Sequence, residues 1–99
     1  MSLDSALGAL KSKIGSADKL DRVVKIDLGD EGVIVADGTK SPTEFSTTDA
    51  EADVTLSMSM DNFQKLLDGD LNPQMAFMTG KLKVTGDMSL AMKLGQILE

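Results

Sequence analysis

The segment of this sequence that most constrains its fold is residues 88–98. It has more apolar residues than a helix packed on one side only would have. At about 100° per residue, Ser89, Lys93 and Gln96 form one narrow polar stripe, and hydrophobic side chains occupy most of the remaining surface. Four partners could cover the excess: another layer of the same domain, a second protomer, a membrane surface or an apolar ligand. A membrane is the weakest of the four, because interfacial helices carry many basic residues and this segment has only Lys93.

The rest of the chain shows alternating helix and strand periodicities. Val24, Ile26 and Leu28 repeat every second residue, as a half-buried strand requires, whereas Leu3, Ala6, Leu7, Leu10 and Ile14 follow the spacing of a helix. Asn72 and Pro73 resemble an N-cap followed by proline at the first helical position. In chain order the patterns predict a helix at 3–14, a strand at 20–28 that forms a hairpin with 33–36, an edge strand at 42–47, a strand at 52–60, short helices at 60–69 and 72–80, a strand at 81–85 and a helix at 88–98.

Length and composition exclude several classes of function. Ninety-nine residues suit one domain, which we expect to span 1–99. The net charge of −6 has the wrong sign for nucleic acid. Without Cys or His we expect no disulfide, metal site, cofactor or catalytic residue, so the predicted protein is not an enzyme. A cofactor-free enzyme that uses Asp, Lys or Ser remains an alternative. The N-terminus lacks a basic region before its apolar residues, and no apolar run could span a bilayer, which predicts a cytoplasmic protein.

Methionine is unevenly distributed. Apart from Met1, all methionines lie in the C-terminal half, at Met58, Met60, Met75, Met78, Met88 and Met92. Flexible methionine side chains fill irregular gaps in cores, which is their commoner use, or line surfaces that adapt to several apolar shapes. Because Phe45, Phe63 and Phe77 are the only aromatic residues, the core could leave a cavity. An empty cavity of ligand size costs several kcal/mol, so we expect flexible closure when it is empty and a more stable fold when it is filled.

Two short motifs do not meet the requirements of known sites. Asp68–Asn72 begins like a calcium loop, but Pro73 stands where the loop needs glycine and Thr79 where it needs glutamate. Gly80-Lys81 is followed by Leu82 in place of the hydroxyl residue of a phosphate loop. An ordinary turn explains both segments.

Residues 54–94 resemble the sterol carrier protein 2 (SCP-2, nonspecific lipid-transfer) family. The elements that carry the resemblance are Asn72-Pro73-Gln74, Gly80-Lys81-Leu82-Lys83 with Thr85-Gly86, and the run from Met88 to Leu94. The resemblance implies an α+β fold with a five-stranded mixed sheet: one helix, three antiparallel strands, a crossover to a fourth strand, short helices, a fifth strand and a terminal helix. It also implies an apolar cavity between the sheet and the C-terminal helices that accepts fatty acids, acyl-CoA, sterols or phospholipids.

The resemblance implies that the excess apolar surface meets a lipid. The residues that it suggests as lining are Leu56, Met58, Phe63, Leu67, Met75, Phe77, Met78, Leu82, Val84, Met88, Ala91, Met92 and Leu94. Gln74 is similar to a family glutamine that could bind the polar end of a ligand. We expect a lipid or fatty-acyl ligand, transient contact with a membrane and a monomer or weak dimer. The alternative is an interaction or homo-oligomerisation module that uses the C-terminal helix.

Overall fold

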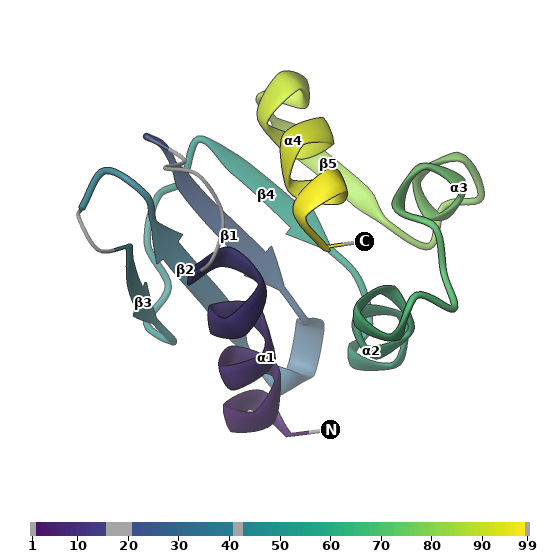
Figure 1. Cartoon of the computed structure of the whole chain (residues 1–99), viewed down its shortest axis with the longest axis horizontal. Coiled ribbons are helices and arrows are strands. Elements are labelled where there is room, and N and C mark those ends of the chain that lie inside the picture. Colours follow the sequence, from purple (N-terminus) through teal and green to yellow (C-terminus); the bar gives the residue numbers. More distant parts are fainter. Residues whose placement is uncertain (1, 16–20, 41–42, 99) are drawn as a thin grey trace.

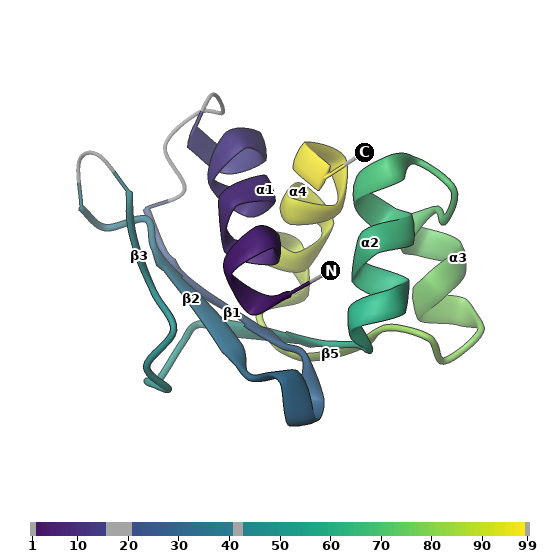
Figure 2. The same cartoon turned by 90° about the horizontal axis from the view of Figure 1, so that it is seen from below.

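One five-stranded mixed sheet organises the chain, with strand order β3-β2-β1-β4-β5 and all helices on one face (Figures 1 and 2). The computed structural model describes residues 2–15, 21–40 and 43–98. The elements are α1 (Leu3–Gly15), β1 (Val23–Asp27), a 3-10 turn (Gly29–Glu31), β2 (Val33–Asp37), β3 (Glu44–Ser46), β4 (Val54–Ser57), α2 (Met60–Asp68), α3 (Pro73–Met78), β5 (Lys83–Gly86) and α4 (Met88–Leu98). This order confirms the predicted α+β fold.

The N-terminal half follows its sequence pattern closely. The backbone N–H of Ser5 donates to the Ser2 hydroxyl at 3.2 Å, and the helix that follows buries Ala6, Leu10 and Ile14. β1 and β2 form the predicted antiparallel hairpin, in which Ile26 pairs with Ile34. Leu20 and Pro42, which the sequence assigned to strands, lie outside the described residues.

The connection from β3 to β4 crosses the face of the sheet that carries no helix. β3 is the predicted edge strand and pairs with β2, whereas β4 lies parallel to β1 on its other side. Lys25 points away from the helices, and its Nζ lies 2.7 Å from Oδ1 of Asp49 in this connection. Hydrogen bonding and the positive charge of Lys25 lower the pKa of Asp49 below its ordinary value of 3.8. The ion pair thus fastens the crossover to the sheet.

The corner between β4 and β5 is tightly packed. Gly86 pairs with Val54, and its φ of +107° is a conformation that L side chains rarely adopt. A β-carbon at Gly86 would overlap the carbonyl oxygen of Asp53, which accepts a hydrogen bond from the N–H of Asp87 at 3.0 Å. The carboxylate of Asp53 also accepts from the N–H of Val23 at 2.8 Å. This corner therefore joins β1, β4 and the start of α4.

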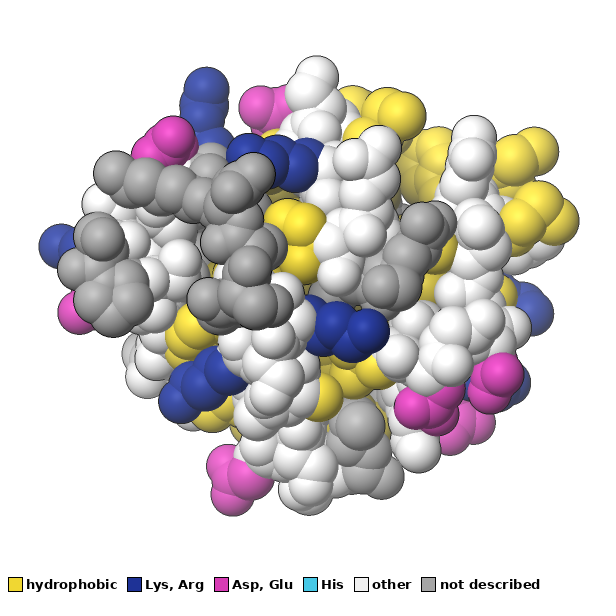
Figure 3. Space-filling model, viewed as in Figure 1, with side chains coloured by type: hydrophobic (Ala, Val, Ile, Leu, Met, Phe, Trp, Pro, Cys, Tyr) yellow, Lys and Arg dark blue, Asp and Glu magenta, His cyan; other side chains and the backbone are white. Residues whose placement is uncertain are grey.

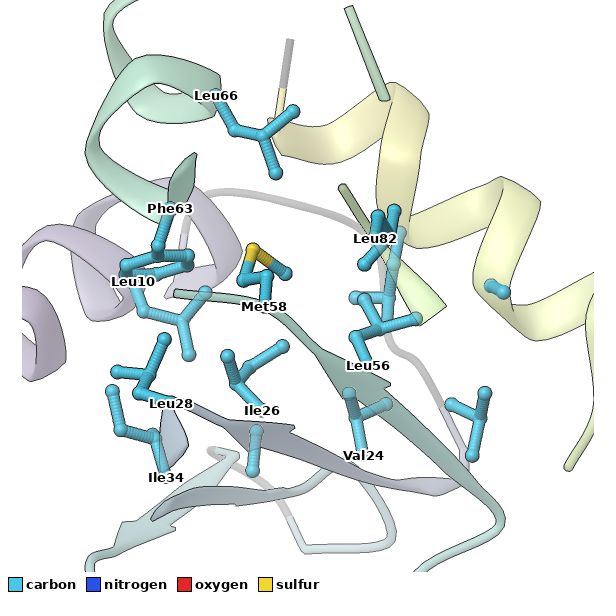
Figure 4. Packing of buried hydrophobic residues seen from close by; sticks show 14 of the residues in the cluster. Leu10, Val24, Ile26, Leu28, Ile34, Leu56, Met58, Phe63, Leu66 and Leu82 are labelled. Atoms are coloured by element: carbon cyan, nitrogen blue, oxygen red, sulfur yellow. The ribbon is translucent and has the colours of Figure 1, made fainter. Parts of the chain in front are cut away.

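A single core lies between the sheet and the helices. Figure 4 shows Ile26, Leu56 and Met58 pointing from the sheet toward the helices. Phe63 and Leu66 of α2 and Leu90, Ala91 and Leu94 of α4 complete the buried cluster on the C-terminal side. α4 packs against α1, β4 and β5. The last helix is therefore a central part of the fold.

Candidate functional site

Side-chain caps fix where the last helices begin. The Oδ1 atom of Asn72 accepts hydrogen bonds from the N–H groups of Gln74 at 2.8 Å and Met75 at 3.2 Å, with Pro73 at the first turn of α3. Oδ1 of Asp87 accepts from the N–H groups of Ser89 at 2.9 Å and Leu90 at 3.2 Å at the start of α4. These bonds satisfy backbone donors that a helix leaves unpaired at its N-terminus. The predicted start at Asn72-Pro73 is confirmed.

Helix α3 is anchored to the core by very little. It has six residues, and Ala76 is the buried one among them. The N–H groups of Lys81 and Leu82 both donate to the carbonyl of Ala76, at 2.8 and 3.0 Å. This is why β5 begins at Lys83 and not at the predicted Lys81. Nδ2 of Asn62 on α2 donates to the carbonyl of Lys81 at 3.4 Å. Hydrogen bonds at its C-terminal end thus connect α3 to the start of β5, and the turn after it to α2.

Helices α3 and α4 approach each other at Gly95. A β-carbon at Gly95 would lie 3.3 Å from Cβ of Pro73, so glycine leaves space for the proline ring. Met92 and Met88 precede Gly95 by three and seven residues and therefore share its side of α4. Phe77 follows Pro73 by four residues and shares its side of α3. The sequence predictions do not include this contact, because Gly8 also stands inside a helix and has nothing within 4 Å of its β-carbon position.

The exposed large hydrophobic side chains of the described residues all lie on these two helices. They form what we call the apolar patch: Met75, Phe77, Met78, Met88 and Met92, with exposed fractions from 45% at Phe77 to 72% at Met78. Figure 3 shows hydrophobic atoms gathered over α3 and α4, at the upper right of the view. The prediction that α4 has more apolar surface than its packing covers is confirmed by the exposure of Met88 and Met92.

The fourteen sequence candidates divide between the core and the patch. Leu56, Met58, Phe63, Leu82, Ala91 and Leu94 are buried, Leu67 and Val84 are half-buried, and Gln74, Met75, Phe77, Met78, Met88 and Met92 are exposed. The structure therefore brings the buried group together under α2 and α4 and places the exposed group on the outer surface of α3 and α4. The amide of Gln74 lies among the exposed set, in the first turn of α3.

Core side chains occupy the region where the sequence suggests a cavity. Leu56, Met58, Phe63 and Leu82 belong to one packed cluster there (Figure 4). An open hollow of about 500 Å³ lies at one end of the sheet, between the β1–β2 turn and the start of α2, and includes Met58 and Met60 in its wall. A second, of about 590 Å³, lies beside β3 and includes Val35 and Thr48. Neither hollow lies beneath α3 and α4.

No helix within the described parts of the chain has both the length and the hydrophobicity needed to cross a membrane. α4 has eleven residues, far fewer than the roughly 20 that a spanning helix needs.

Sequence comparison finds relatives that match about half of the chain. The chain is 54% identical over 48 residues to hydroxysteroid dehydrogenase-like protein 2 of Bos taurus, a match that covers 48% of this chain and 12% of that protein. It is 53% identical over 47 residues to human sterol carrier protein 2, covering 48% of this chain and 9% of the relative. The chain thus corresponds to a small part of these much longer proteins.

Structure comparison extends the likeness to almost the whole chain. The apo form of sterol carrier protein 2 from Yarrowia lipolytica superposes with a TM-score of 0.75 at 29% identity, covering 96% of this chain and 84% of that one. Sterol carrier protein 2 from Aedes aegypti, solved in complex with palmitate, shares the fold with a TM-score of 0.78 at 24% identity, covering 99% and 96%. A profile of the SCP-2 sterol transfer family matches residues 4–99. The chain therefore belongs to the SCP-2 sterol transfer family.

Proposed function

We propose that this chain binds a fatty-acyl lipid between its sheet and helices α2, α3 and α4, and carries it from one membrane to another. The observation that carries the proposal is the split of apolar side chains on α4, where Leu94 is buried and Met92 is 65% exposed. Because α4 has apolar side chains on both its inner and its outer surface, it can contact apolar groups whether the binding space is open or closed. Residues 1–99 act in this proposal as one lipid-binding domain without an enzymatic step.

We propose that the binding space opens at α3, which makes few contacts with the core and with α4. α3 contributes one buried alanine to the core, and its contact with α4 is made by Pro73 against a glycine. Moving α3 and the adjacent side of α4 outward would uncover Leu82 and Val84 on one side and let methionines of the apolar patch turn inward. Methionine suits this change because its side chain is flexible and adapts to different apolar surfaces.

Burial of hydrocarbon supplies the energy for this opening. Each methylene that leaves water contributes about 0.8 kcal/mol, so a long acyl chain can offset the separation of a few core contacts. We propose fatty acids and acyl-CoA as the ligand class, with the exposed Gln74 near the polar end of the ligand. The palmitate complex of the Aedes aegypti protein makes palmitate a suitable first probe. Because the chain contains no Tyr, Trp or His that could bind a sterol hydroxyl, we place sterols second.

Two measurements test the proposal. Lipid extracted from the purified protein and identified by mass spectrometry should include an acyl lipid in stoichiometric amount. Delipidated protein should then bind a fluorescent fatty acid in the absence of membranes, and palmitate should displace it. A folded, lipid-free protein that binds neither probe would overturn the proposal.

Substitutions at Met78 test where the acyl chain lies. Both Met78→Lys and Met78→Asp should weaken binding by about tenfold or more, because either charge would have to leave water beside the ligand. The pair of opposite charges separates this effect from attraction to the fatty-acid carboxylate. Gln64→Lys and Gln64→Asp, at an exposed position of α2, are the matched controls. Unchanged affinity in both Met78 variants would remove the apolar patch from the ligand-binding site.

Leu94→Asp is expected to abolish fatty-acid uptake as well, but it tests the site less directly. Leu94 has no exposed surface, so an aspartate there would be buried among core side chains. Burial of an unpaired carboxylate costs several kcal/mol and destabilises the whole fold. Far-UV circular dichroism must therefore accompany any binding measurement on this variant.

The exposure of the apolar patch also favours a second function, an interaction or self-association module. In that case the patch would be covered by protein and not by lipid. Sedimentation equilibrium of delipidated protein with and without palmitate separates the two functions. Self-association that persists with palmitate bound would support the module.

A further inference from the structure

We propose that the methionines of the apolar patch are a site of reversible oxidation, and that their oxidation by a peroxide weakens binding of the acyl ligand. The modified residues are Met75, Met78, Met88 and Met92. This inference rests on the function proposed above, because it concerns the side chains that would turn toward an acyl chain. It adds a chemical modification, and with it a means of regulating the proposed site.

The first argument is the difference in exposure among the methionines of the described residues. In the patch, the exposed fractions run from 46% at Met88 to 72% at Met78. Outside the patch, Met58 is 7% exposed and Met60 is half-buried. Because a peroxide must reach the sulfur atom to oxidise it, the patch methionines should react before Met58. Their sulfur atoms lie on α3 and α4, where hydrophobic atoms gather in Figure 3.

The second argument is composition. The chain contains no cysteine, whose thiolate would react with a peroxide in competition with methionine. It also contains no tryptophan, tyrosine or histidine. The thioether sulfurs of methionine are therefore the readily oxidised side-chain atoms of this chain. Oxidation by a peroxide should thus be directed to the patch.

The reaction is a transfer of one oxygen atom. The thioether sulfur forms a bond to one oxygen of hydrogen peroxide, the O–O bond breaks, and the other oxygen leaves as water. Sulfur loses two electrons and the peroxide gains them. Methionine sulfoxide reductases reverse the step with two thiols, which become a disulfide while the sulfoxide oxygen leaves as water.

The sulfoxide differs from the thioether in how well it can be buried. In the lipid-bound state proposed above, the patch methionines would lie near the acyl chain, Leu82 and Val84, and none of these groups can donate a hydrogen bond from its hydrocarbon. A sulfoxide oxygen buried there would lose its water without replacement, which weakens binding by about tenfold or more. Without ligand the same side chains are exposed, so the oxygen stays hydrated and the fold should be preserved.

Oxidation followed by a binding measurement tests the proposal. Delipidated protein is treated with hydrogen peroxide until peptide mass spectrometry shows sulfoxide at the patch methionines and intact thioether at Met58, and the peroxide is then removed. Displacement of a fluorescent fatty acid, measured without membranes, should show an affinity for palmitate at least about tenfold lower than before treatment. Methionine sulfoxide reductase with dithiothreitol should restore the affinity, and far-UV circular dichroism should stay unchanged throughout.

Two leucine variants locate the effect, since leucine replaces methionine with little change in volume and cannot be oxidised in this way. Each is compared with its own affinity before treatment, and both retain Met1. The first lacks the other methionines of the chain, with Met58→Leu and Met60→Leu, and should still lose affinity by about tenfold or more on treatment. Peroxide should change the affinity by about twofold or less in the second variant, which combines Met75→Leu, Met78→Leu, Met88→Leu and Met92→Leu.

Palmitate should in turn protect the patch. If Met78 and Met92 turn toward the acyl chain, their sulfur atoms leave water and should be oxidised several times more slowly with palmitate bound. Met60 lies outside the patch and is the reference within the same protein. Palmitate itself is saturated and does not consume peroxide. Equal oxidation of Met78 with and without saturating palmitate would contradict the proposal.

Three further results would overturn it: unchanged affinity after the patch methionines are converted to sulfoxide, an equal loss in the variant with four leucines, or a loss of affinity that coincides with unfolding. Untreated protein that binds no palmitate would overturn the proposed function, and this inference with it. Equal binding before and after oxidation would overturn this inference alone, so the two failures are distinguishable.

Discussion

Gly86 illustrates how a single residue without a side chain determines the geometry of a corner of the fold. Its φ of +107° and its contact with the backbone of Asp53 exclude a β-carbon. Gly8 is the opposite case, because nothing lies within 4 Å of the place where its β-carbon would be. The sequence predictions place Gly8 inside a helix and Gly86 between a strand and a helix. Only the structure shows that one glycine is required and the other is replaceable.

Gly86→Ala should therefore destabilise the protein by about 3 kcal/mol or more, since it combines backbone strain with overlap against a carbonyl oxygen. Gly8→Ala should instead stabilise it by about 0.5–1 kcal/mol, because alanine favours the helical conformation of α1. Urea unfolding of the two variants against the wild-type chain measures both. Equal effects would show that the corner at Asp53 relaxes around a methyl group.

The sequence predicts the site residues as a group, but it does not show which of them are buried and which are exposed. Four of the six residues of α3 are hydrophobic side chains other than proline, namely Met75, Ala76, Phe77 and Met78, and Gln74 is the one polar residue in the helix. The structure buries Ala76 and exposes the other three. The contact between Pro73 and Gly95 joins residues far apart in the chain, and no local pattern encodes it.

Elements, in contrast, follow directly from local chemistry. The helical stripe of Ala6, Leu10 and Ile14 and the alternation of Val24, Ile26 and Leu28 each predict a buried side, and these side chains are buried. The predicted strands at 52–60 and 81–85 are shorter in the structure, at Val54–Ser57 and Lys83–Gly86. Residues that were predicted to belong to these strands form helix caps and turns instead. Ser59 caps α2, and the N–H groups of Lys81 and Leu82 donate hydrogen bonds to α3.

The cap of α4 provides a test at this scale. Asp87→Ala removes the acceptor for the N–H groups of Ser89 and Leu90, and should lower the free energy of unfolding by about 1 kcal/mol. Asp87→Asn retains a capping oxygen and should lose little of this energy. Thermal unfolding should show a decrease of about 4–8 °C for the alanine variant. An asparagine variant as unstable as the alanine variant would indicate that the charge of Asp87, and not its hydrogen bonds, stabilises α4.

For the molecule as a whole, binding of the proposed ligand to the folded chain should raise its stability. A ligand that binds the folded chain at a hundred times its Kd adds about 2.7 kcal/mol, which corresponds to a rise in Tm on the order of 10–20 °C for a domain of this size. Differential scanning calorimetry with and without palmitate measures the rise, and Met78→Lys should reduce it. A Tm that stays constant at saturating palmitate would contradict the proposed binding space.

Because α3 buries only one side chain in the core, its exposed residues can change without changing the fold. Because one alanine links α3 to the core, amide hydrogens in this helix should exchange with solvent long before those of the sheet. Substitutions at the exposed Met75, Phe77 and Met78 should accordingly have little effect on folding while they alter the surface that a cargo molecule would meet. If α3 lines the proposed binding space, such substitutions would change which ligands fit and leave the architecture unchanged.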